Sequence, residues 1–200
     1  DKVNITANFE ESKLKITDLK KFYKELNGTD VITFSGNMNG KLNNFDLKNL
    51  KLNTKKGIEI IGDLSFVNAV NTARGFVFEG DFKNLSATYN ELKNVLPNVL
   101  GKTLPTEFAK FGKFKINGGV KVTPTQIEAS VKMNSRLGTI ISDLEIDKID
   151  NIAKASYIGD LELINFKMGT FFNNPIFGKV SLNGFVNGSG FTLDNINTAF

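Results

Sequence analysis

The sequence contains no cysteine, no histidine and no tryptophan. Disulfides, Cys/His zinc sites and catalytic pairs in which histidine activates a serine or cysteine are therefore excluded. Carboxylates are present, but they fall on positions that we expect to face water, and no tryptophan platform for a sugar accompanies them. We therefore expect a protein that is not an enzyme and that holds no cofactor.

Arginine is also scarce, since Arg74 and Arg136 are the only two in 200 residues. The net charge of +4 comes almost entirely from lysines scattered along the chain, whereas a nucleic-acid surface gathers Arg and Lys on one face. We expect no nucleic-acid partner. No run of 18 apolar residues occurs, so no membrane-spanning helix is predicted. A chain that begins at Asp1 rather than at methionine suggests a segment of a longer protein.

Apolar residues alternate with polar ones over most of the chain, a pattern that is typical of half-buried β-strands. Between Ile32 and Leu42, for example, Phe34 and Met38 share one parity, and polar residues occupy the other. Asn/Gly/Lys turns separate about 12 such runs. The predicted strands cover residues 3–9, 12–17, 32–42, 45–53, 57–67, 76–83, 113–122, 125–134, 138–147, 156–163, 179–187 and 190–198.

The apolar parity of these strands predicts one continuous inner face, because a strand turns alternate side chains to the same side. We expect this face to bind acyl chains without any encoded chemistry for a lipid headgroup. The predicted lining residues are Phe34, Met38, Leu42, Phe78, Phe82, Phe114, Ile116, Val120, Val122, Leu161, Leu163, Val180, Leu182 and Val186.

Glycines also fall on the apolar parity, where each replaces an inward side chain. They are Gly36, Gly40, Gly80, Gly118, Gly159, Gly184 and Gly188. One interpretation is curvature, since glycine lets a sheet bend and relieves crowding on its concave side. The other is room for a ligand lying along that face. Curvature is the favoured interpretation, although a curved trough needs both.

Helical periodicity is brief, and none of the helices is long enough to cover a large sheet. Asp18 is expected to cap a helix that docks Phe22 and Tyr23 on the sheet. Thr88 and Glu91 have the spacing of a capping box. The predicted short helices lie at 18–27, 88–96, 105–111 and 169–172.

A threefold repeat underlies these elements, because a strand, a short aromatic-rich helix and a glycine-bearing strand recur in that order. We predict one continuous domain with repeats at roughly 12–79, 80–158 and 159–200, the second carrying an insertion around Pro97 to Pro105. The predicted fold is mostly β: a long, curved antiparallel sheet that forms a groove. A sheet of this size must curl, split or fold over, so closure as a sandwich or barrel is the alternative to an open apolar face.

Several segments resemble the TamB-like branch of the AsmA-like proteins, in particular its Bacteroidetes-type members. They are Tyr157–Phe166, Gly178–Gly190, and Phe82–Thr88 together with Leu96-Pro97 and Leu104-Pro105, and the resemblance covers about residues 30–200. It implies a periplasmic β-groove ("β-taco") in a protein anchored to the inner membrane, with an outer-membrane barrel partner such as TamA. The implied role is phospholipid movement between the two membranes, or help in outer-membrane biogenesis.

Two other interpretations of the sequence concern a metal site and a role without lipid. Asp143, Glu145 and Asp147 share one parity and form an acidic ladder, but no tight glycine loop accompanies them, so a solvated face is favoured over a Ca²⁺ site. The whole chain is alternatively a structural or protein-docking β-module, a scaffold for outer-membrane protein assembly or secretion, with a closed core and no lipid.

Overall fold

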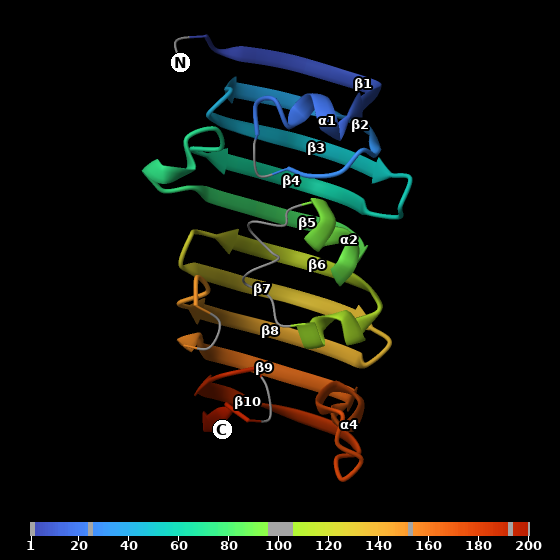
Figure 1. The fold of residues 1–200 in the computed structure, drawn as a ribbon, viewed down its shortest axis with the longest axis vertical. Helices are drawn as coiled ribbons and strands as arrows, with labels where there is room; N and C mark the ends of the chain where they lie inside the picture. The colour runs from blue at the N-terminus through green and yellow to red at the C-terminus, as the bar shows by residue number, and fades with distance from the viewer. Residues whose placement is uncertain (1–2, 24–25, 96–105, 152–153, 192–193, 200) are drawn as a thin grey trace.

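The computed structural model describes residues 3–23, 26–95, 106–151, 154–191 and 194–199. Within these residues, eleven strands form a single antiparallel sheet whose spatial order is the order of the sequence, and the sheet is open at β1 and at β11 (Figure 1). The strands are β1 (Ile5–Lys15), β2 (Val31–Lys41), β3 (Asn44–Thr54), β4 (Glu59–Val67), β5 (Val77–Thr88), β6 (Lys113–Val122), β7 (Gln126–Ser135), β8 (Gly138–Asp147), β9 (Ser156–Lys167), β10 (Lys179–Ser189) and β11 (Asn197–Ala199). The mostly β, groove-like antiparallel sheet predicted from the alternating pattern is confirmed.

The helices of the described chain are short. They are α1 (Ile16–Leu19), α2 (Tyr89–Val95) and α4 (Met168–Phe172), with the 3₁₀ helices η1 (Thr72–Arg74) and η2 (Thr106–Phe111). Helices α1, α2 with η2, and α4 lie in the connections from β1 to β2, β5 to β6 and β9 to β10, which is every fourth connection. Figure 1 shows α1, α2 and α4 along the same rim of the sheet, which we call the helical rim.

The first two predicted strands, 3–9 and 12–17, form the single strand β1. Its pairing with β2 advances by three residues from Phe9 to Ser12, while β2 advances by two from Gly36 to Phe34. Glu10-Glu11 is therefore the site of a β-bulge rather than a turn, because one extra residue is absorbed without ending the strand. Of the last predicted strand, 190–198, residues 197 and 198 belong to β11.

The predicted helix at 18–27 is wrong in extent. α1 begins after Lys15, which makes no side-chain cap, and Asp18 lies inside the helix. The expected docking of Phe22 is also wrong, since this residue is 55% exposed. Tyr23 does contact the sheet: its ring lies 6.1 Å from that of Phe45, and burial raises the pKa of its phenol.

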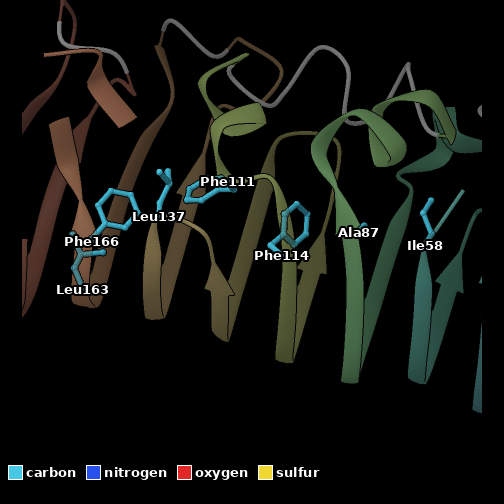
Figure 2. Packing of buried hydrophobic residues seen from close by; sticks show 7 residues of the cluster. All are labelled: Ile58, Ala87, Phe111, Phe114, Leu137, Leu163 and Phe166. Carbon is cyan, nitrogen blue, oxygen red and sulfur yellow. The ribbon is translucent and has the colours of Figure 1, made fainter. Parts of the chain in front are cut away.

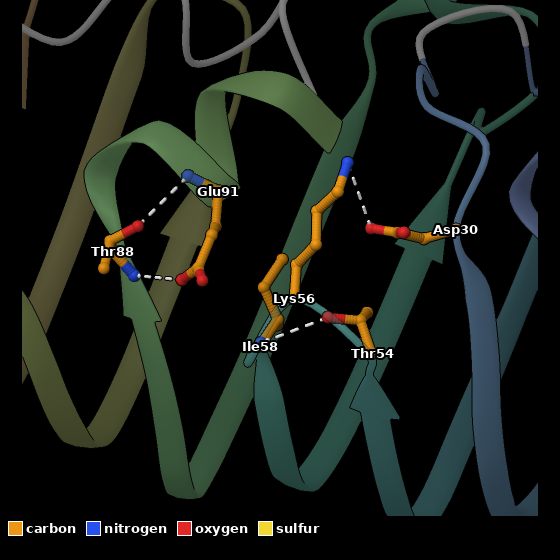
Figure 3. Close-up of polar contacts among 6 residues, drawn as sticks. All are labelled: Asp30, Thr54, Lys56, Ile58, Thr88 and Glu91. Carbon is orange, nitrogen blue, oxygen red and sulfur yellow. Dashed lines mark hydrogen bonds and ion pairs between the residues drawn. The ribbon is translucent and has the colours of Figure 1, made fainter.

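The predicted capping box at the start of α2 is present (Figure 3). The backbone N–H of Thr88 donates to Glu91 Oε2 at 2.7 Å, and the N–H of Glu91 donates to Thr88 Oγ1 at 3.3 Å. These bonds satisfy two donors that the first turn of a helix leaves free. The predicted end of this helix at Leu96-Pro97, Leu104-Pro105 and the insertion between them lie outside the described residues.

We expect Thr88→Ala to lower the free energy of unfolding by about 1 kcal/mol, the usual effect of removing a helix cap. Urea unfolding followed by circular dichroism measures this loss. Thr29→Ala is the matched control, because Thr29 is exposed and lies in the connection between α1 and β2, away from any helix start. Equal stability of the Thr88 and Thr29 variants would contradict the role of the capping box.

Candidate functional site

Cross-strand register aligns the inner side chains in rows that run across the sheet. One row lies close to the helical rim and is apolar on nine successive strands. It contains Phe34, Leu52, Ile60, Leu85, Ile116, Met133, Ile140, Leu163 and Leu182. The predicted alternation thus places one side of every strand from β2 to β10 on a common apolar face.

The helical connections cover the rim side of this face with a second layer. Figure 2 shows buried side chains beneath these connections, and Phe111 of η2 packs with Phe114 and Leu163 of the sheet. Side chains of α2 and α4, including Leu92 and Met168, pack on the same cluster. This part of the inner face is a closed hydrophobic core, so the expectation that no helix is able to seal the inner face is wrong for its rim side.

Two further rows lie on the other side of the inner face, away from the helical rim, and we call them the apolar strip. The first row is Ala7, Met38, Leu47, Leu64, Gly80, Val120, Ala129, Leu144, Gly159 and Val186. The second row is Ile5, Gly40, Phe45, Phe66, Phe78, Val122, Ile127, Ile146, Tyr157 and Gly188. The strip contains no charged residue.

Most side chains of the apolar strip are half-buried. Val120, Ala129 and Leu144 retain part of their surface, and no helix of the described chain packs on them. Phe45 stacks on Phe66 with ring centroids 4.8 Å apart, and Phe66 lies 5.2 Å from Phe78. Side chains here pack mainly against their neighbours in the sheet, so the strip offers apolar surface to a ligand.

The register separates the predicted lining residues into groups. Met38, Phe78, Val120, Val122 and Val186 belong to the apolar strip, whereas Phe114, Ile116, Leu161, Leu163 and Leu182 pack in or against the core beneath the helices. Phe34 and Phe82 belong to a cluster formed by sheet residues, and Val180 pairs with Phe166.

Leu42 is a wrong assignment, because β2 ends at Lys41. Leu42 lies in the turn before β3 and is 38% exposed. Sequence reasoning also missed the strip residues of β3, β4, β7 and β8, among them Leu47, Phe66, Ala129 and Leu144. They follow the same alternation as the predicted lining residues, but only the pairing register between strands shows that they lie in the strip.

The inner-face glycines differ in what surrounds them. At Gly118 and Gly159, φ is +120° and +138°, and an added Cβ would overlap the carbonyl oxygens of Ser130 and Asp143 on the adjacent strand. These positions require glycine for close strand approach, as do Gly40 and Gly188, where a Cβ would overlap the backbone of a neighbouring strand. At Gly36, by contrast, the backbone oxygen of Lys48 lies 3.1 Å from the Cβ position. The Phe82 ring occupies the space at Gly80, whereas nothing lies within 4 Å of a Cβ at Gly184.

The opposite, outer face of the sheet carries charge. Asp63 pairs directly with Asp81, and both line a shallow hollow of about 400 Å³ together with Asp143, Lys48 and Lys121. The backbone N–H of Asn49, 2.8 Å from Asp63 Oδ1, lowers the pKa of the Asp63 carboxyl, and Lys48 at 3.3 Å acts in the same direction. A hollow lined by charged side chains of both signs does not suit acyl chains, so the two faces differ in the ligands they can accept.

The acidic ladder lies on this outer face. The side-chain amide of Gln126 donates to Glu145 at 2.8 Å and to Asp147 at 3.1 Å. Across the parts of the chain that the structure describes, no three acidic side chains converge in a way that suits a metal ion.

No family model, curated protein or solved structure matches this chain. Of the helices that the structure describes, none has the length and apolar character needed to cross a membrane.

Proposed function

We propose that this chain is a periplasmic segment of a TamB/AsmA-like protein and that its apolar strip carries phospholipid acyl chains between the inner and outer membranes. The observation that carries the proposal is the strip itself. Twenty aligned positions on ten strands contain no charge, and most keep accessible apolar surface. The proposal includes an inner-membrane anchor and a TamA-like outer-membrane barrel as partner of the longer protein, in support of outer-membrane biogenesis.

Hydrophobic burial supplies the binding energy in this proposal. Each buried acyl methylene contributes about 0.8 kcal/mol, so several methylenes hold a lipid without any polar contact. Ten strands span about 43 Å at about 4.8 Å per strand step, which gives a lipid tail a long apolar surface to follow. Because the strip has no cation, a phosphate headgroup stays in water beside the sheet.

A structural or protein-docking β-module is the second candidate, and the covered half of the inner face favours it. Leu137 and Ala87 are almost fully buried beneath the helical connections, as expected of a closed core. In that case, partners would bind through the open edge of β1, where unpaired backbone groups accept an added strand.

The deciding experiment is photocrosslinking with a photoactivatable residue at Ala129, in the strip. The same residue at Ser130, the next position and on the outer face, is the matched control. We expect phospholipid adducts at position 129 and none at 130, and we expect native mass spectrometry of the purified chain to show copurified phospholipid. Absence of adducts at 129 together with lipid-free protein would favour the structural module.

A further inference from the structure

Three aromatic residues bridge the inner face near its C-terminal end. Phe191 follows β10, and its ring lies 5.3 Å from Tyr157, which belongs to the apolar strip on β9. The same ring meets Phe108 of η2 edge-on, with centroids 6.3 Å apart and planes at 88°. Phe108 in turn packs on Phe111 and Phe171 in the helical layer. The bridge therefore joins the strip to the helical rim across the inner face.

Backbone contacts fix the position of Phe191. Gly190 has φ +78°, a left-handed conformation that turns the chain back after β10, and its N–H donates to the carbonyl of Ala155 at 3.1 Å. The N–H of Phe191 donates to Asn195 Oδ1 at 3.1 Å. An added Cβ at Gly190 would overlap the carbonyl of Asn195, so this turn depends on glycine.

Burial along the strip is uneven. In its first row Val186 on β10 is 0% exposed, and Leu64 and Gly80 on β4 and β5 are also buried, whereas Ala129 and Leu144 on β7 and β8 are half-buried. Near the other end, Tyr23 contacts Phe45 at 6.1 Å, and its hydroxyl donates to the carbonyl of Leu42 at the rim opposite the helices. Tyr23 follows α1, and its backbone N–H donates to the carbonyl of Leu19 at 2.9 Å, so its side chain also reaches from the helical rim across the inner face to the strip on β3.

We infer that Phe191 closes the C-terminal end of the apolar strip, so that an acyl chain lies along β4–β8, between Tyr23 and Phe191, and stops before β9. The inference rests on the proposed function for the identity of the ligand, but the closure itself is a property of the protein. Passage along the whole sheet then requires the Phe191 ring to leave its place between Tyr157 and Phe108. Phe191 thus limits the length of apolar surface available to a ligand.

The closure is tested without lipid by cysteine reactivity, since the natural sequence has no cysteine. In a Val186→Cys protein, Phe191→Ala is expected to raise the rate of reaction with a small maleimide at least tenfold. Phe191→Leu restores an apolar side chain and should return most of the protection. Ala129→Cys is the control for general loosening, and its rate should change less than twofold on Phe191→Ala. Unchanged protection of the thiol at position 186 in the Phe191→Ala protein would overturn the inference.

The claim that an acyl chain stops before β9 is tested with palmitic acid that carries a diazirine. The crosslinked residues are then mapped. In the unchanged protein we expect adducts on β4–β8, and in the Phe191→Ala protein we expect them to extend to β9 and β10. Adducts on β9 and β10 of the unchanged protein would overturn the inference. Faster reaction of the thiol at position 186 with no adducts in either protein would support the closure and reject the proposed function.

Discussion

Gly159→Ala is expected to destabilise the sheet by about 3 kcal/mol or more, whereas Gly184→Ala should be tolerated. Both glycines lie on the inner face, on β9 and β10, so burial alone does not separate them. The backbone at Gly159 has φ +138°, which costs a residue with a Cβ about 1–3 kcal/mol. The added Cβ would also overlap the carbonyl oxygen of Asp143, and a ladder carbonyl moves only if the strand moves with it.

Gly184 provides the matched control, because a Cβ there meets nothing within 4 Å. Alanine also restricts the unfolded chain more than glycine does, so Gly184→Ala is expected to be neutral or to stabilise by up to about 1 kcal/mol. Urea denaturation gives the two free energies of unfolding, and equal slopes would show that the extent of unfolding is the same. Similar midpoints for the two variants would mean that neither glycine is required by the local geometry.

Alternation predicted the sheet well, because the period of two reports directly which residues share a face. β6 and β8 illustrate this: each coincides with its predicted strand, at 113–122 and 138–147. The bulge at Glu10-Glu11 was not predictable in the same way. Two adjacent exposed glutamates are as compatible with a turn as with an extra residue in a strand, and only the pairing of Phe9 and Ser12 with β2 decides between them.

The alternating pattern does not predict that the inner face is divided into a half covered by helices and an apolar strip. Phe114 and Val120 alternate identically in β6, yet Phe114 lies in the core beneath the helices and Val120 in the strip. The two residues differ because η2 packs against Phe114 and not against Val120. Nothing in the sequence indicates which part of the sheet η2 contacts. The bridge by Phe191 escaped prediction for the same reason, since it needs the contacts with Tyr157 and Phe108.

Val120→Asp is expected to abolish phospholipid crosslinking at Ala129, if the strip holds acyl chains as proposed. Val120 pairs directly with Ala129 across β6 and β7, so the carboxylate would stand at the lipid's position. A carboxylate covered by an acyl chain loses its water without gaining a partner, which costs several kcal/mol. A loss of this size lowers occupancy more than a hundredfold, because each 1.4 kcal/mol is a factor of ten.

Charged variants at different positions distinguish a loss of lipid binding at the strip from a general loss of folding. Val120 is half-buried, so its carboxylate keeps access to water in the lipid-free protein and the fold should survive. Val186→Asp is unsuitable for this purpose, since a fully buried site would unfold around the charge. Lys121→Asp adds the same side chain on the outer face of the same strand and should leave crosslinking intact. If Val120→Asp crosslinks phospholipid as strongly as Lys121→Asp does, acyl chains do not lie on the apolar strip, because no lipid tail covers an unpaired carboxylate at so little cost.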